Sequence, residues 1–314
     1  MKPKIVLIGA GKFGSNHLRN LIALHDRGKI DLISVVDADK KILQTVKEKY
    51  SISTSMNYKQ FLSEANSFDI VTPAFTHFNL VKQLLNNSKN VFVEKPLSLN
   101  FKNADELVKL AKKRKKILQV GHIFRYNPAV NNLKKLLKKE KNFPFYINGR
   151  FLANTIPKTD LGAIFNFVHH FDILDNLLKT LPHKIFTIQN LIDKKIKKEI
   201  NVDIFLQYPK NINSFLSLGW IPVGKYRTLE LFFKNKQIIC DFQNQEIKII
   251  YDRRHSRKIK QKFQEPLLLE LEDFVNCVNT NQTPVSDGTI GARIVKIAEA
   301  ATRSMNLSKP ISLR

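Results

Sequence analysis

Cysteine is scarce in this chain of 314 residues, which has only Cys240 and Cys277. Their separation does not match the short spacings of metal-binding or redox-active cysteine motifs, so we expect no metal site. Both thiols are expected to be reduced and to pack as small, buried apolar side chains, as is usual in a cytoplasmic protein.

Long apolar runs are absent as well. No stretch approaches the roughly 20 apolar residues that a membrane-spanning helix needs. The chain enters its first apolar run, Lys4–Ile8, without the basic and apolar leader of a secretory signal. We therefore expect no membrane partner. With 43% apolar and 25% charged residues, the composition is that of an ordinary globular protein, and its length suffices for two domains.

Acidic residues are few, since 27 Asp and Glu face 52 Lys and Arg and give a formal net charge of +25. Such an excess of positive charge is found in many nucleic-acid-binding proteins. Here the lysines are scattered or form local runs such as Lys112–Lys116, and aromatic residues are not interleaved with them. We therefore expect no nucleic-acid partner. Lys, Asn, Ile and Phe are all abundant, which is typical of an AT-rich coding sequence and explains the positive charge without a function. A second interpretation is that the positive charge attracts an anionic substrate.

The most informative stretch is Gly9–Gly14, which reads Gly-Ala-Gly-Lys-Phe-Gly directly after the apolar run Lys4–Ile8. Between an expected strand and an expected helix, this pattern is the dinucleotide-binding fingerprint. Gly9 permits the tight turn, Gly11 lets the backbone approach a pyrophosphate, and Gly14 allows close helix packing. The amino end of the following helix then offers N–H groups to the phosphates.

A second apolar run, Leu32–Val36, ends at Asp37. This is where the fold places the carboxylate that accepts hydrogen bonds from the ribose hydroxyls. Because a carboxylate repels a 2′-phosphate, Asp37 favours NAD over NADP. We predict that Lys12 and Phe13 of the fingerprint loop belong to the same cofactor site.

From Met1 to Gly121, short apolar runs alternate with helical patterns, which predicts a doubly wound parallel sheet. The expected elements include a short strand at 52–54 and a helix over 58–65. Ligands of such sheets bind beyond the carboxyl ends of the strands. The residues expected at those ends are Asp37, Thr72, Pro73, Glu94, Lys95, Pro96, Gly121 and His122.

After residue 145 the pattern changes to closely spaced strands, which is typical of an antiparallel sheet. One helix, Ile164–Leu178, interrupts this series, and helices over 267–279 and 289–305 close the chain. The prediction is an α/β fold with a dinucleotide-binding domain at 1–121 and an α+β domain at 122–314. We expect the helix 289–305 to pack back on the first domain.

With Glu94-Lys95-Pro96 added to the fingerprint, the sequence resembles the glucose–fructose oxidoreductase / inositol dehydrogenase / MocA (Gfo/Idh/MocA) family of NAD(P)-dependent sugar oxidoreductases. The resemblance extends over nearly the whole chain. The other matching stretches are Thr72-Pro73 with His77, Gly121–Pro128, Glu270 to Phe274, Asp287-Gly288, Ala298–Ala300 and Ser304. It implies an open-faced antiparallel sheet in the second domain and a homo-oligomer, and it implies cofactor contacts by Thr72, Pro73, His77, Glu94 and Lys95.

The resemblance also implies two catalytic positions. Lys95 would hydrogen-bond the reacting oxygen, after a cis bond to Pro96. The family pattern of glycine, three residues, Asp, three residues and His fits Gly162 to His170, with Asn166 in the place of the Asp. On one continuous helix Asn166 and His170 would share a face, so His170 is predicted as the proton acceptor, with His169 as the alternative. Packing roles for both histidines stay open.

The stretches around Gly121–Pro128 and Trp220 look like those of family members that oxidise nucleotide-linked sugars. The predicted substrate contacts are Arg125, Tyr126, Asn127, Asn166, Asp172, Trp220 and Arg227. Arg227, together with Lys225, would meet a phosphate or a carboxylate, although Arg125 and Arg227 would equally serve to cap structural elements, and Trp220 would equally serve as a core residue.

The sequence thus favours an NAD-dependent dehydrogenase that moves a hydride between a secondary alcohol and the nicotinamide. The substrate would be a sugar, a sugar acid or a nucleotide sugar. Because Asn166 replaces an acidic residue, a non-catalytic NAD-binding regulator on the same fold is the alternative hypothesis. Redox-assisted glycoside cleavage on the same scaffold is a third.

Overall fold

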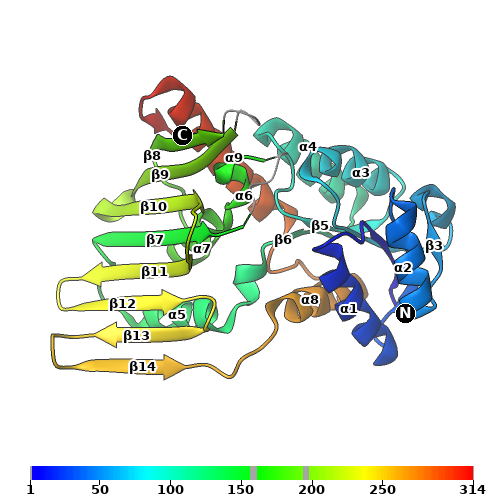
Figure 1. The fold of residues 1–314 in the computed structure, drawn as a ribbon, viewed down its shortest axis with the longest axis horizontal. Helices are drawn as coiled ribbons and strands as arrows, with labels where there is room; N and C mark the ends of the chain where they lie inside the picture. The colour runs from blue at the N-terminus through cyan, green and yellow to red at the C-terminus, as the bar shows by residue number, and fades with distance from the viewer. Residues whose placement is uncertain (1, 156–160, 194–197, 314) are drawn as a thin grey trace. The chain divides into compact units, whose positions relative to one another are not determined.

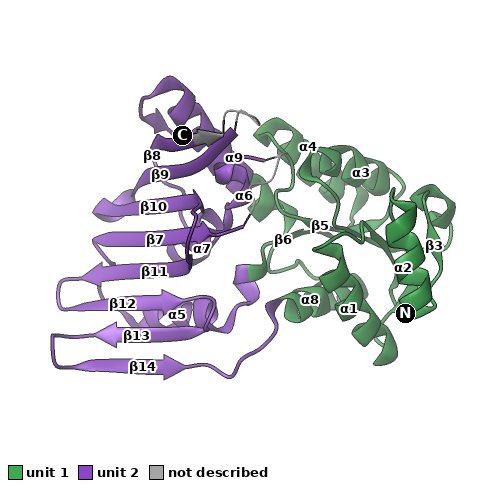
Figure 2. Cartoon of the chain, viewed as in Figure 1, with its two compact units in different colours: residues 1–123, 267–293 green, residues 124–266, 294–314 purple. Residues whose placement is uncertain are grey.

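The computed structural model describes residues 2–155, 161–193 and 198–313 (Figure 1). The chain folds into two compact units (Figure 2). Unit 1 comprises residues 1–123 and 267–293, and unit 2 comprises residues 124–266 and 294–314. The chain therefore returns to unit 1 after unit 2 has begun.

Unit 1 is built on a six-stranded, wholly parallel sheet with the strand order β3-β2-β1-β4-β5-β6. This order is that of a doubly wound dinucleotide-binding fold and confirms the predicted fold class. The strands are β1 (Lys4–Ile8), β2 (Asp31–Val36), β3 (Thr54–Ser55), β4 (Ser67–Ile70), β5 (Asn90–Glu94) and β6 (Leu118–Gly121). The helices between them are α1 (Gly14–Asp26), α2 (Lys40–Tyr50), α3 (Ala74–Asn86) and α4 (Phe101–Arg114).

The core of unit 1 forms between the central strands and helices on their faces. Strand β1 is nearly continuous in apolar residues because both of its faces are covered, and Ile5, Val6 and Leu7 are fully buried. Helix α8 (Pro266–Thr280) supplies part of this core from far along the chain. Its Phe274 ring meets Phe92 of β5 edge to face, with centroids 5.8 Å apart.

One predicted helix of unit 1 was wrong. The segment 58–65 was expected to be helical, but only a short 3-10 turn, η1 (Tyr58–Phe61), forms there. None of the residues of η1 is buried, so the turn has no apolar face that would stabilise a longer helix. The short strand expected at 52–54 lies at Thr54–Ser55 instead.

Unit 2 contains a nine-stranded, mostly antiparallel sheet with the order β14-β13-β12-β11-β7-β10-β9-β8-β15. Strands β7 and β10 pair in parallel at its centre, and the other pairs are antiparallel. The strands are β7 (Tyr146–Ala153), β8 (Lys184–Asp193), β9 (Lys198–Tyr208), β10 (Ile212–Trp220), β11 (Lys225–Phe233), β12 (Lys236–Asp241), β13 (Glu246–Ile250), β14 (Ser256–Lys260) and β15 (Ile311–Ser312).

One face of this sheet carries helices, as Figure 1 shows for α5 (Pro128–Lys139) and α7 (His169–Leu178). Along β7, buried residues alternate with partly exposed ones, as expected where one face of a sheet is covered and the other is open. Helix α5 was not among the predicted elements. It starts at Asn127, whose side chain accepts hydrogen bonds from the backbone N–H groups of Ala129 and Val130.

The predicted continuous helix Ile164–Leu178 is broken. It consists of α6 (Ala163–Asn166) and α7, and Phe167 leaves the helical conformation between them with φ −109° and ψ 35°. The expected shared face of Asn166 and His170 was therefore wrong, because an i, i+4 relation holds only within one helix.

Helix α9 (Gly288–Leu307) closes the chain, and its first residues group with unit 1 while those from 294 group with unit 2. None of the helices in the described ranges combines the length and apolar character that crossing a bilayer requires.

Candidate cofactor and substrate sites

The fingerprint loop has the backbone geometry that its glycines predict. Gly9 has φ +97°, and a Cβ there would lie 2.5 Å from the Val71 carbonyl oxygen. A Cβ at Gly14 would lie 2.1 Å from the Gly9 carbonyl oxygen. By contrast, a Cβ at Gly11 would meet no atom within 4 Å, so Gly11 leaves a space beside the backbone where a pyrophosphate fits.

Asp37 is hydrogen-bonded to the fingerprint loop. Its Oδ2 accepts from the Ala10 backbone N–H at 2.7 Å, and its Oδ1 accepts from the Asp39 N–H at 2.9 Å. Each carboxylate oxygen keeps acceptor capacity for a further donor. Helix α1 has no acidic residue in its first turn and no side-chain cap at its amino end. Amide donors beside a carboxylate acceptor suit the phosphates and a ribose diol of NAD, and Lys12 and Phe13 are exposed in the same loop.

A buried cluster of three ionisable side chains lies behind this loop. The His17 Nδ1 is 2.8 Å from Asp69 Oδ2, and its Nε2 is 3.2 Å from Glu94 Oε1. Burial alone lowers the pKa of His17, but the two carboxylates outweigh it and raise this pKa from 6.5 to about 10. Burial raises the pKa of Asp69, and His17 opposes that rise. His17 is therefore an imidazolium held between two carboxylates.

Sequence reasoning missed His17 and Asp69. The available signals were weak: a histidine on the buried face of a helix, and one acid within the otherwise apolar strand β4. Glu94, which was predicted as a cofactor contact, uses Oε1 for His17 and Oε2 for the backbone N–H of Lys95 at 3.2 Å. A Cβ at Gly121 would lie 2.5 Å from Glu94 Oε1, so a larger residue there would displace the Glu94 carboxylate.

Lys95 follows β5 directly and is half-buried. Its peptide bond to Pro96 is cis, as the family resemblance implied. His77 connects two strand ends of unit 1, since its Nδ1 is 2.7 Å from the Pro96 carbonyl oxygen and its Nε2 is 2.9 Å from that of Thr72. Burial lowers the pKa of His77, and a neutral ring donates to one carbonyl at a time. Thr72 is partly buried and Pro73 is exposed at the start of α3.

The two histidines of unit 2 differ sharply in exposure. His170 is 0% exposed, and its Nε2 donates to the Thr228 carbonyl oxygen at 3.0 Å. Its ring fills the space above Gly149, where a Cβ would lie 2.4 Å from the His170 Cδ2. Burial lowers the pKa of His170 to about 4. His169 is partly exposed, with its ring 4.9 Å from Phe151 and 5.0 Å from Phe124.

Arg125 and Asp172, both predicted substrate contacts, bind each other. The Arg125 Nε donates to Asp172 Oδ1 at 2.5 Å, and its Nη2 donates to Asp175 Oδ2 at 2.7 Å. All three side chains are 2% exposed. Burial raises the pKa of Asp172 to about 6 against the opposing effect of Arg125. The three side chains form a buried ion-pair network within unit 2.

Other predicted substrate residues also have packing partners. Tyr126 is 7% exposed, and Asn127 caps α5 while its Nδ2 donates to the Phe242 carbonyl oxygen at 3.1 Å. Trp220 is 6% exposed, with its ring edge to face on Phe167. Asn166 is buried at the carboxyl end of α6.

Arg227 on β11, also a predicted substrate contact, differs from these residues in its exposure. It is only partly buried, and its guanidinium lies 4.9 Å over the ring of Phe151.

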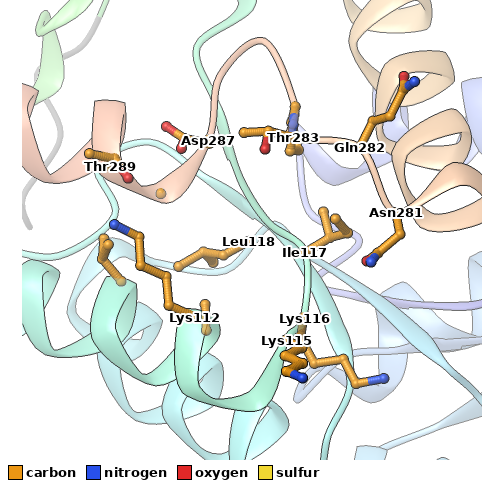
Figure 3. A pocket seen from close by; sticks show the side chains of 14 residues that line it. Lys112, Lys115, Lys116, Ile117, Leu118, Asn281, Gln282, Thr283, Asp287 and Thr289 are labelled. Carbon is orange, nitrogen blue, oxygen red and sulfur yellow. The ribbon is translucent and has the colours of Figure 1, made fainter.

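A separate cavity of about 280 Å³ lies in unit 1, between the end of α4, the start of β6 and the loop that leads into α9 (Figure 3). Lys112, Lys115 and Lys116 line one side of it, and Asp287 and Thr289 line the other. It lies at the amino end of β6, whereas Gly121 is at the carboxyl end. The cavity is therefore not part of the fingerprint site. Across the described residues, no group of His, Cys, Asp and Glu is arranged to hold a metal ion.

The chain is similar to known oxidoreductases in both sequence and fold. The model of the Gfo/Idh/MocA oxidoreductase family, described as having an NAD-binding Rossmann fold, matches residues 3–122. UDP-N-acetylglucosamine 3-dehydrogenase of Acidithiobacillus ferrooxidans is 22% identical over 304 residues, which cover 93% of this chain and 94% of the relative. Its solved structure matches with a TM-score of 0.88 and covers 98% of this chain and 99% of that one.

Myo-inositol 2-dehydrogenase of Thermotoga maritima is 25% identical over 334 residues, covering 99% of this chain and 98% of the relative. The family model agrees with the fingerprint loop and the parallel sheet of unit 1, and the solved structure of the UDP-N-acetylglucosamine 3-dehydrogenase shares the fold of the whole chain. Residues 3–122 thus match the NAD-binding domain of the Gfo/Idh/MocA oxidoreductase family, and the chain as a whole is similar to named dehydrogenases.

Proposed function

We propose that the protein is an NAD-dependent dehydrogenase that oxidises a secondary alcohol of a sugar, a sugar acid or a nucleotide sugar. The observation that carries this proposal is the hydrogen bond from Ala10 of the fingerprint loop to Asp37. It supports a site that takes phosphates and a ribose diol side by side. The similarity to named dehydrogenases of UDP-N-acetylglucosamine and inositol favours an enzyme over a non-catalytic regulator.

In this proposal Gly9, Gly11 and Gly14 hold the pyrophosphate of NAD, and Asp37 binds a ribose. Bound NAD would supply the hydride acceptor of the reaction. Lys95 hydrogen-bonds the reacting hydroxyl and lowers the cost of its deprotonation. Glu94 and His17 act as positioning residues, because Glu94 accepts a hydrogen bond from the Lys95 backbone N–H and His17 holds Glu94 in turn.

We assign the proton acceptor to His169 instead of His170. A base must reach its proton within hydrogen-bond distance. His170 has no exposed surface and uses its Nε2 on Thr228, whereas His169 is partly exposed at the start of α7. Asn166 has no assigned role here, and Tyr126, Asn127 and Trp220 support the site by packing.

We further propose a homo-oligomer in which the open face of the nine-stranded sheet pairs with a second copy of the chain. That face carries half-buried side chains, both apolar and polar, as in β7 and β10. Within the described residues, both cysteines are buried and unbridged, which supports a reducing, cytoplasmic location.

The test is NADH formation by the purified protein with NAD and a panel of sugars, inositols, uronates and UDP-sugars. His169→Gln is expected to abolish turnover while NAD still binds. His170→Gln would keep its donor to Thr228 and is expected to change the melting temperature more than the turnover. The opposite pattern would return the base to His170, and inertness across the panel despite NAD binding would favour the regulator.

A further inference from the structure

Arg227 lies on the helix-bearing face of the second sheet. In the antiparallel pair of β11 and β7, Arg227 is directly opposite Phe151, and residues directly opposite each other share a face. Phe151 is 2% exposed and belongs to the buried face. The guanidinium carbon of Arg227 lies over this ring, 4.9 Å from its centroid, in a cation–π contact.

The charge of Arg227 has no counterion among the described residues, since no carboxylate lies within ion-pair distance of it. Its Nε is buried without a hydrogen-bond partner, and burial lowers the pKa of the side chain. A guanidinium stays charged at any ordinary pH. A desolvated cation without a partner costs free energy in the fold.

The opposite face of the same two strands provides an internal comparison. Arg150 of β7 stacks on Tyr226 of β11 at 5.0 Å, which is nearly the same arrangement. Arg150, however, has a carboxylate partner, since its Nη2 is 3.4 Å from Glu230 Oε1. The structure thus neutralises one stacked arginine of this strand pair and leaves the other with its charge uncompensated.

A second cation adds to the charge at Arg227. Lys225 precedes it by two residues on β11 and therefore points to the same face. Repulsion by Arg227 is the main reason that the pKa of Lys225 lies below its usual value. Two neighbouring cations that repel each other form a site that an anion would stabilise.

Arg227 lies close to His169, which limits how far the anionic group can be from the reacting hydroxyl. The Phe151 ring lies 4.9 Å from the Arg227 guanidinium and 4.9 Å from the His169 ring. Arg227 and the proposed base are therefore neighbours of one aromatic ring. An anionic group on Arg227 would belong to the same small molecule as the hydroxyl that His169 deprotonates.

We propose that Arg227, assisted by Lys225, binds an anionic group of the substrate, so that the protein acts on an acidic or nucleotide-linked sugar and not on a neutral polyol. The proposal rests on the dehydrogenase function argued above and narrows it. A carboxylate and a phosphate share the chemistry that a guanidinium recognises, with two acceptor oxygens for its parallel N–H donors.

The experiment measures ligand binding, so that it does not depend on turnover. Glucuronate, UDP-N-acetylglucosamine and myo-inositol are titrated calorimetrically into the NADH-loaded protein, its Arg227→Met variant and the matched control Arg150→Met. We expect an anionic ligand to bind the wild type and the control alike, and to bind Arg227→Met at least about tenfold more weakly, since a lost charged hydrogen bond is worth about 1.5–3 kcal/mol.

The three ligands distinguish which chemical group the protein recognises. Binding of glucuronate identifies a carboxylate as the recognised group, and binding of UDP-N-acetylglucosamine without glucuronate identifies a phosphate. Equal affinity of Arg227→Met and wild type for the anionic ligand, or binding of myo-inositol alone, would overturn the proposal. Anion binding that depends on Arg227 without NADH formation from any sugar would leave it standing and refute the dehydrogenase function instead.

Discussion

Replacing His17 by Gln tests how the cofactor edge of unit 1 is held together. The variant removes the cation between Asp69 and Glu94 and leaves two buried carboxylates facing a neutral amide. Removing one partner of a buried ion pair costs about 3–5 kcal/mol, because the remaining charge is uncompensated. The rise of the His17 pKa from 6.5 to about 10 corresponds to about 5 kcal/mol at about 1.36 kcal/mol per pKa unit. We therefore expect His17→Gln to lose several kcal/mol of stability.

The pH dependence follows from the sign of the shift. The folded-state pKa of His17 lies above its unfolded value, so its contribution is complete below pH 6.5 and is lost as the pH rises towards about 10. The free energy of unfolding of wild type should therefore approach that of His17→Gln over this window, by up to about 1.4 kcal/mol per pH unit.

The assay is urea-induced unfolding followed by circular dichroism, at several pH values across that window. His255→Gln is the control, because the ring of His255 also meets a carboxylate, Asp252 at 2.8 Å, but its side chain is 75% exposed. We expect the control to unfold like wild type. A His17→Gln variant that unfolds like wild type, or a loss that does not change with pH, would refute the charged cluster.

Two other predictions concern single side chains. Asp37→Ser should weaken NAD binding and strengthen NADP binding, each by about tenfold, because it removes the carboxylate that repels a 2′-phosphate; unchanged preference in cofactor titrations would contradict this role of Asp37. Arg125→Met should destabilise the protein by about 3–5 kcal/mol, since it removes the cation that binds the buried Asp172 and Asp175. Asp172 has a pKa of about 6 beside Arg125, and loss of that cation raises this pKa further. The loss of stability, measured by unfolding at several pH values, should therefore shrink as the pH falls towards 6 and level off below it, where Asp172 is protonated in both proteins. A loss that stays constant with pH would contradict this role of the ion pair between Arg125 and Asp172.

The parts of the fold that the sequence predicted are those encoded locally. The run Lys4–Ile8, the glycines after it and Asp37 at the next strand end each have a backbone or hydrogen-bonding requirement that few other residues meet. The alternation of apolar runs and helical patterns likewise predicted a parallel sheet followed by a mostly antiparallel one, because the period of the pattern differs between strands and helices.

The parts that it missed depend on tertiary contacts. Arg125 and Asp172 were each predicted to contact the substrate. Only the fold shows that Arg125 Nε lies 2.5 Å from Asp172 Oδ1. The break at Phe167 separates α6 from α7 without a proline or glycine to mark it. His169 and His170 are the same residue type at adjacent positions, so the sequence does not distinguish their roles. Their burial in the fold does.

The central claim is that this fold uses NAD to oxidise a sugar alcohol with Lys95 at the reacting oxygen. The most direct measurement compares wild type and Lys95→Ala for NAD affinity by calorimetry and for NADH formation with the best sugar of the panel. We expect similar NAD affinity in both proteins and a loss of turnover of at least about a hundredfold in the variant. Equal turnover in both proteins, or no NADH from wild type despite bound NAD and sugar, would contradict it.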